Sequence, residues 1–122
     1  MSKLIEASFL IVLTEPIHLV SVSDSVEDLL GFKAAEFISG EVSLQGQTHL
    51  DDDDISKKIF STDFPKPFAT FNIRIRHHDG RIRCIKGTYT KEQSADGHIT
   101  LDLLLQDAKS LWSSSSEAAM MT

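Results

Sequence analysis

The stretch of sequence that decides the fold runs from Phe68 to Asp107 and reads FATFNIRIRHHDGRIRCIKGTYTKEQSADGHITLDLLLQD. Apolar and polar residues alternate from Ala69 to His77, and a period of two is typical of a strand with one buried and one solvent-facing side. A turn at residues 78–80 precedes a second alternating segment, and a polar turn at residues 93–97 precedes a third. The stretch therefore predicts three consecutive antiparallel strands.

The turn at residues 78–80 sets the register between the first two of these strands. A two-residue loop would place Ile73 opposite Lys86. A three-residue loop closed by a left-handed Gly80 places Ile73 opposite Ile85 instead. Because a slip of one residue moves every side chain to the other face, we expect the register that pairs apolar with apolar residues. That register implies a type I turn with a glycine bulge.

The composition indicates one domain with a single core. The chain has 122 residues, of which 41% are hydrophobic, and a formal net charge of -6. An acidic balance argues against nucleic-acid binding, which usually needs a basic surface. The arginines at residues 74–83 form a local basic patch, and the need to keep a strand edge soluble explains this patch as well as a bound ligand would. One cysteine excludes an internal disulfide, and no apolar run approaches the roughly 20 residues of a membrane helix. We expect a soluble, cytoplasmic protein without direct membrane contact.

The first half of the chain predicts two strands and several short helices. Phe9–Leu13 is apolar on both alternating faces, which is typical of a central strand, and residues 17–22 are its expected hairpin partner. Residues 42–48 are expected to be irregular. Three helices are expected, namely after Ser25, at residues 34–38 and at Asp52–Phe60. This order of elements predicts an α+β fold with one antiparallel sheet and helices gathered on one face.

Five short motifs, in this order and spacing, resemble those of PAS domains. They are Val20–Phe32, Glu36–Gly40, His49–Asp52, His78–Arg83 and Gln106–Asp107. The first ends in the Leu-Gly-Phe of a strand-to-helix passage, the third is similar to a His-Pro-Asp-Asp motif with leucine in place of proline, and the fourth matches an Asp-Gly hairpin. The sequence departs from the family where Cys84 replaces a usual tryptophan, and where Asp107 is followed by alanine and lysine rather than isoleucine and threonine.

The resemblance implies a PAS-like five-stranded antiparallel sheet in spatial order 2-1-5-4-3, with short helices on one face. It implies an N-terminal lead-in at residues 1–8, a sensory domain at residues 9–108, and the start of a linker helix with a flexible tail at residues 109–122. It also implies a sensory input module of a larger signalling protein, such as a diguanylate cyclase or histidine kinase. In such proteins the last strand passes into a helix that carries the signal to the effector domain, which places the signal output here at Asp107, as the expected start of that helix.

The space between sheet and helices, which we call the cup, is the candidate ligand site. Its expected lining consists of Phe37, Leu44, Ile59, Phe60, Phe71, Ile73, Ile85, Tyr89, Leu101 and Leu103. Because such residues also form an ordinary packed core, a ligand-free PAS dimerisation module is the alternative to a small-ligand sensor. A third reading, a small isomerase or dehydratase, would need an acid or base inside the cup. Tyr89 is the one titratable residue in that lining, so we expect no enzymatic activity from this domain.

No residue pattern predicts a cofactor or a metal ion. Cys84 lies in an expected strand and not in the helical Asn-Cys-Arg-Phe-Leu motif of flavin-binding relatives, and the third expected helix lacks the histidine of haem-binding ones. His49 is expected to bond locally at the start of that helix. His77 and His78 are adjacent in a strand and point to opposite faces. The run Asp51–Asp54 lacks the spacing of a calcium loop and fits an acidic helix start.

The outer face of the sheet predicts a homodimer interface. In the expected register this face keeps three residues of low polarity, which are Ile82, Cys84 and Leu104. A monomer would leave them in water. The N-terminal residues Leu4, Ile5 and Phe9 are expected to join this interface.

Overall fold

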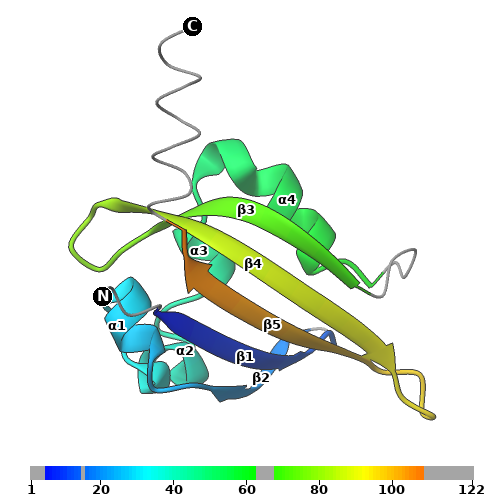
Figure 1. The fold of residues 1–122 in the computed structure, drawn as a ribbon. Coiled ribbons are helices and arrows are strands. Elements are labelled where there is room, and N and C mark those ends of the chain that lie inside the picture. The colour runs from blue at the N-terminus through cyan, green and yellow to red at the C-terminus, as the bar shows by residue number, and fades with distance from the viewer. Residues whose placement is uncertain (1–4, 15, 63–67, 109–122) are drawn as a thin grey trace, which may run out of the picture.

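The computed structural model of the protein describes residues 5–14, 16–62 and 68–108. Within them, five strands form one antiparallel sheet in the order β2-β1-β5-β4-β3 (Figure 1). The elements in chain order are β1 (Glu6–Val12), β2 (His18–Val22), α1 (Val26–Leu30), α2 (Ala34–Ser39), α3 (Leu44–Gln47), the 3-10 turn η1 (Leu50–Asp52), α4 (Asp53–Ile59), β3 (Phe68–Arg76), β4 (Ile82–Gln93) and β5 (Ile99–Asp107).

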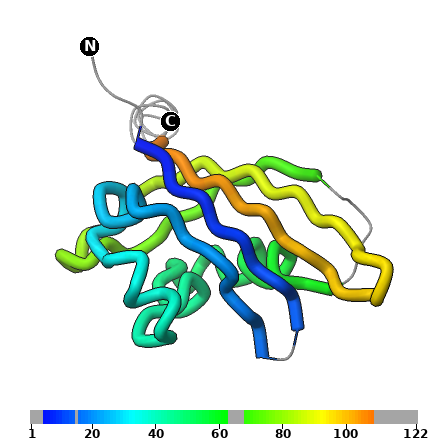
Figure 2. The backbone as a smooth tube through the Cα atoms, turned by 90° about the horizontal axis from the view of Figure 1, so that it is seen from below, coloured from blue at the N-terminus to red at the C-terminus, as the bar shows by residue number. Residues whose placement is uncertain are grey.

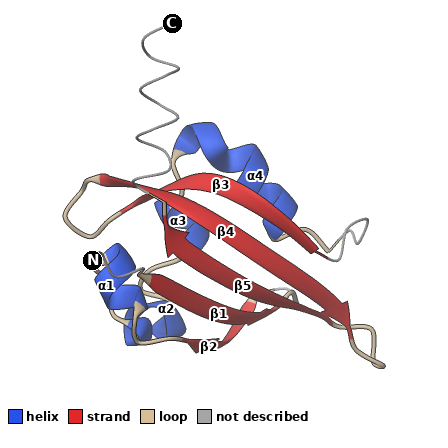
Figure 3. Cartoon of the chain, in the orientation of Figure 1, coloured by secondary structure: helices blue, strands red, loops and turns tan. Residues whose placement is uncertain are grey.

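The helices and the sheet form two layers. Figure 2 shows the strands side by side as one layer and the helical segments together on one of its faces, and Figure 3 shows the same division by element type. This is the expected α+β class with the expected strand order, and both predictions are confirmed. In the described part of the chain, no helix is long and apolar enough to cross a membrane.

The β3–β4 hairpin has the register that places apolar residues opposite apolar residues. Ile73 lies opposite Ile85, and Phe71 lies opposite Gly87. Gly80 has the left-handed conformation, with φ at 90°, and its amide donates to the carbonyl of His77 at 2.9 Å. The glycine closes the turn because a residue with a Cβ atom rarely adopts this conformation.

The core lies between the helices and the inner face of the sheet, and β1 supplies its centre. Ala7, Phe9 and Ile11 are each 1% exposed. The ring of Phe9 packs edge-to-face on Phe37 of α2, with 5.5 Å between centroids. The expectation that Phe9 joins a dimer interface is therefore wrong, because strand alternation turns this residue inward.

Two boundaries differ from the sequence-based expectation. β1 begins at Glu6, inside the expected lead-in, because the backbone of residues 6–8 already pairs with β5. Residues 42–48 are not wholly irregular, since α3 forms at Leu44–Gln47. The hydroxyl oxygen of Ser43 accepts the amide of Gly46 at 2.9 Å, and this N-cap starts a helix that its own residues favour weakly.

The end of α1 is attached to the β3–β4 turn. Gly31 ends the helix in the left-handed conformation, with φ at 81°. The amide of His78 donates to the carbonyl of Leu30 at 2.9 Å. A Cβ atom on Gly31 would lie 2.5 Å from Cε1 of His77, so the glycine allows the imidazole ring to lie directly on the helix end.

We predict that Gly31→Ala lowers the free energy of unfolding by about 2–4 kcal/mol, of which about 1–2 come from left-handed strain and the rest from the clash with His77. Gly40→Ala is the matched control. Gly40 also ends a helix, with φ at 87°, but nothing lies within 4 Å of its Cβ position. Urea unfolding followed by circular dichroism measures both variants. Equal losses would show that His77 moves aside freely.

Candidate functional site

The cup is filled almost completely by its own side chains. Its residual cavity has a volume of about 10 Å3, roughly the room that one water molecule needs. The cavity is lined by Leu44, Thr48, Ile59, Phe60, Phe71, Ile73, Ile75, Leu103 and Leu105. Six of the ten expected lining residues are in this set. The set also includes three residues that were not expected, namely Thr48, Ile75 and Leu105.

The other four expected residues belong to the surrounding core. Phe37 contacts Phe9, away from the cavity lining. Ile85 and Leu101 are fully buried within the sheet. Tyr89 is half-buried on the inner face of β4. The cup lining is thus narrower than the expected set and lies closer to α3, α4 and β3.

Phe71 fills the cup because the strand beside it has a glycine. Gly87 lies directly opposite Phe71, and a Cβ atom there would be 2.1 Å from Cζ of the phenyl ring. The ring therefore lies across the backbone of β4, next to Tyr89 at a centroid distance of 6.2 Å. Because Gly87 has no side chain, the ring of Phe71 can cover the inner face of the sheet at this point.

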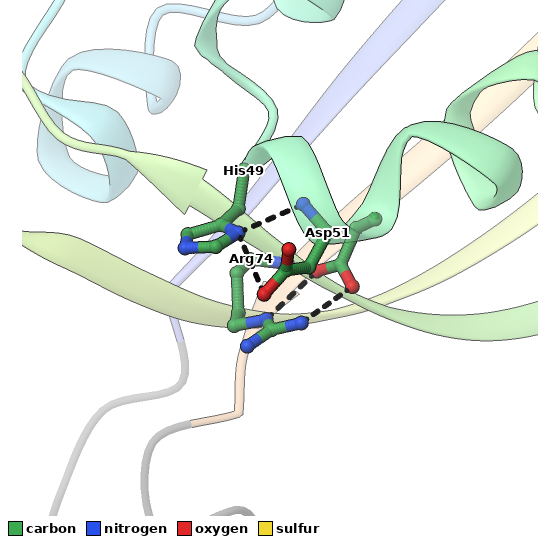
Figure 4. Close-up of polar contacts among 4 residues, drawn as sticks. His49, Asp51 and Arg74 are labelled. Carbon is green, nitrogen blue, oxygen red and sulfur yellow. Dashed lines mark hydrogen bonds and ion pairs between the residues drawn. The ribbon is translucent and has the colours of Figure 1, made fainter.

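An ion pair joins the start of α4 to the edge strand β3. Arg74 donates from Nε to Oδ2 of Asp52 at 3.0 Å and from Nη2 to Oδ1 at 2.8 Å. The backbone amide of Arg74 also donates to Oδ2, at 2.8 Å. Figure 4 shows the guanidinium beneath η1, turned toward the carboxylates. The paired geometry is that of a strong charge-assisted contact.

The charge of Arg74 acts on the titration of Asp52. The hydrogen bonds from this guanidinium lower the pKa of the Asp52 carboxyl below its usual 3.8, although burial works in the opposite direction. The same bonds raise the pKa of Arg74. Asp52 is therefore a carboxylate at neutral pH and holds η1 against the sheet.

His49 bonds locally, as expected from its place before η1. Its Nδ1 accepts the backbone amide of Asp51 at 3.1 Å, and its own amide donates to the carbonyl of Arg74 at 2.8 Å. His49 therefore caps η1 and attaches it to β3 (Figure 4).

Asp107 is the last residue of β5 and lies at the end of the inner face. Its amide donates to the carbonyl of Ile5 at 3.0 Å. Its Oδ2 lies 3.6 Å from Nη1 of Arg83. The described chain thus begins and ends side by side. The linker helix expected after Asp107 falls on residues 109–122, outside the described residues.

The comparison with protein families decides the family. The model of the PAS fold matches residues 19–101. The chain belongs to the PAS fold family. Comparison with curated proteins finds no match to this sequence.

Solved PAS structures share the fold at low identity. A PAS domain from Colwellia psychrerythraea is 17% identical, with a TM-score of 0.66 and 84% of each chain covered. The N-terminal domain of a diguanylate cyclase with a PAS/PAC sensor from Marinobacter aquaeolei is 14% identical, with a TM-score of 0.62, covering 84% of this chain and 94% of that one. A domain of a putative light and redox sensing histidine kinase from Haloarcula marismortui is 11% identical, with a TM-score of 0.68, covering 84% and 88%.

Lys91 is a buried cation of this PAS domain that the pattern of polar and apolar residues did not reveal. It follows Tyr89 on the inner face of β4 and is 2% exposed. Its Nζ donates to the carbonyls of Lys58 and Ser61 at 3.1 and 2.7 Å, and it lies 5.2 Å from the centroid of the Tyr89 ring. Lys91 is an even number of residues from Ile85 and Tyr89, so alternation along the strand was the one sequence feature that could have indicated its inward position.

Cys84 lies half-buried on the outer face of the PAS sheet, opposite Arg74. Burial raises the pKa of its thiol, so the group is a neutral thiol at pH 7. Within residues 5–14, 16–62 and 68–108, no three His, Cys, Asp or Glu residues stand together in a way that could hold a metal ion.

We predict that Asp52→Asn lowers the free energy of unfolding by about 2 kcal/mol at pH 7, since hydrogen bonds to a charged group contribute roughly 1.5–3 kcal/mol. Asp53→Asn is the control. Asp53 pairs with Lys57 on the exposed side of α4, and its loss should change little.

The difference between wild type and Asp52→Asn should depend on pH. The folded pKa lies below 3.8, so the unfolded chain takes up this proton first on acidification. The stabilisation is therefore complete above about pH 5 and is lost as the pH falls through the folded pKa. Urea unfolding between pH 7 and pH 3 measures it. A difference that stays constant over this range would contradict the assignment.

Proposed function

We propose that this PAS domain is the sensory input module of a larger signalling protein, and that changes in the cup reach an effector through Asp107. The observation that carries the proposal is that residues lining the cavity lie next to the Arg83–Asp107 ion pair at the end of the sheet. Leu105 lines the cavity, and Asp107 follows it two residues later on the same face. Ile75 also lines the cavity, and it lies opposite Arg83, the partner of Asp107.

The chemistry of this connection suits a switch. A partly exposed ion pair at 3.6 Å contributes little to stability, so its rearrangement costs little. A shift of Ile75 or Leu105 would change the distance between Arg83 and Asp107. Asp107 also holds the first described residue through its amide, so the start of β1 would respond as well.

The solved relatives support an attached effector. Two of them are parts of a diguanylate cyclase and a histidine kinase, and we assign this domain the same kind of setting, in the cytoplasm. The ligand would be a small molecule bound in the cup. We place flavin and haem outside the proposal, because Cys84 is turned away from the cup and α4 carries no histidine.

A ligand-free PAS dimerisation module is the second candidate. The specific observation in its favour is the cavity of about 10 Å3, which leaves space for no organic ligand in this conformation. An enzyme ranks below both. Lys91 does bring a titratable group to the cup, but its Nζ donates to two backbone carbonyls, which favour the protonated ammonium, and a general base must be unprotonated.

The dimer would use the outer face of the sheet. Ile82 is 42% exposed there, and Cys84 and Leu104 are half-buried on the same face. Leu10 of β1 lies diagonally next to Leu104 across the strand pair. These apolar side chains lie on the side of the sheet opposite the helices, with Lys86 and Gln106 between Cys84 and Leu104, and a second copy would cover them.

We predict that, in the polypeptide that carries the effector, Asp107→Ala alters output more than it alters thermal stability. The ion pair is worth about 1 kcal/mol at most, against roughly 5–15 kcal/mol for a domain. Arg83→Gln removes the same pair from its other side and should give the same change of output. Asp102→Ala, at an exposed position of the same strand, should not.

Effector activity and thermal midpoint are measured side by side for the three variants. A collapse of the midpoint in Asp107→Ala would make Asp107 a structural residue. Unchanged activity in both signalling states would rule out this route of output.

We predict that wild type is a dimer at micromolar concentration and that Leu104→Lys and Ile82→Lys are monomers, because each buries a charge in the interface. Ile38→Lys is the control, since Ile38 is 49% exposed on α2, on the helix side of the molecule. Static light scattering gives the mass of each. A monomeric wild type, or a dimer that survives both sheet substitutions, would refute the interface.

A further inference from the structure

A groove of about 670 Å3 lies outside the cup, between the β1–β2 connection and α4. It is lined by Leu13, Thr14, Pro16, Ile17, Gln45, Lys57, Phe60, Ser61 and Thr62. Leu13, Ile17 and Phe60 supply apolar surface, while hydroxyl, amide and ammonium groups supply the rest. A groove of this size and mixed lining accommodates a small organic molecule with one polar end.

Phe60 separates this groove from the cavity inside the cup. Among the described residues, it is the one side chain that lines both spaces. On its inner side the lining is apolar except for Thr48, and on its outer side it is largely polar.

Lys91 bonds the chain on both sides of Phe60. Phe60 follows the last residue of α4, where backbone carbonyls have no partner within the helix. Nζ of Lys91 donates to two carbonyls at this helix end, that of Lys58 at 3.1 Å and that of Ser61 at 2.7 Å. These carbonyls stand on either side of Phe60 in the sequence. The buried ammonium therefore holds the turn that carries the ring.

We propose that the groove is the mouth of the cup, that Phe60 is the barrier in it, and that Lys91 is the positioning residue that keeps the barrier closed. The site would take a small apolar molecule with one hydrogen-bonding head group. Its apolar body would lie among residues such as Ile73 and Leu103, and its head would remain at the mouth near Thr14 and Gln45. The proposal deepens the sensory function above and rests on it for the biological ligand, but the route itself is a property of the isolated chain.

The experiment measures how fast benzene exchanges with an enlarged cup. Ile73→Ala provides the cavity, because Ile73 is buried and lines the existing space; an apolar cavity made by such a deletion binds benzene. Ile75→Ala is a second background in case the first does not fold. Exchange rates are read by NMR on the 122-residue chain, with Lys91→Met or Lys58→Met added to each background.

We expect Lys91→Met to speed benzene exchange on the order of tenfold, equivalent to about 1.4 kcal/mol of barrier, with little change in the dissociation constant. Lys58→Met is the matched control, because it removes an exposed lysine of the same helix and leaves its backbone carbonyl in place. Phe60→Ala should speed exchange at least as much as Lys91→Met.

Equal rates with and without Lys91→Met would overturn the proposal, and so would equal acceleration by both lysine substitutions. Failure of benzene to bind in either folded background would overturn it too, because the enlarged cup would then have no entrance. None of these exchange measurements needs an effector or a natural ligand. They can therefore disprove the entrance route without disproving the sensory function, and the reverse also holds.

Discussion

The pairing of β1 with β5 is the constraint on which the rest of the structure depends. The two strands run antiparallel over seven residue pairs, from Glu6 opposite Gln106 to Val12 opposite Thr100. They occupy the middle of the sheet, so β2 and β3 are left at opposite edges. The chain must then travel from one edge to the other, and it does so across one face. The helices α1 to α4 are this crossing, which is why they cover the inner face and close a cup over it.

The sequence allowed the local pairing of the strands to be predicted from physical argument. Gly80 and the alternation around Ile73 and Ile85 were sufficient for the hairpin register, because a shift by one residue would have exposed the apolar set. The order of the strands came from the resemblance of motifs and not from the residues themselves. Pairing between β1 and β5 joins segments about 90 to 100 residues apart, as in Ala7 opposite Leu105, and no local pattern specifies it.

The site was harder to predict than the fold. A sequence names apolar residues but not the volume that remains between them, which depends on side-chain rotamers. Here the ring of Phe71 lies over Gly87 and fills much of the cup. Lys91 escaped notice because lysine is almost never fully buried, and its partners are backbone carbonyls that only the folded end of α4 brings within reach. α3 was missed for a similar reason, since four residues with a glycine among them carry little periodic signal.

The contacts of η1 have a consequence for the exposed edge of the sheet. The edge strand of a sheet presents unpaired amides and carbonyls to which a strand of another molecule can add. At Arg74 both groups are already occupied, the amide by the carboxylate of Asp52 and the carbonyl by the amide of His49. At this residue of β3, the Asp52 side chain and the His49 backbone thus occupy the groups that an added strand would bond. Protonation of Asp52 would weaken the contact that occupies the Arg74 amide, so the ion pair that holds η1 against β3 also blocks strand addition at this point of the edge.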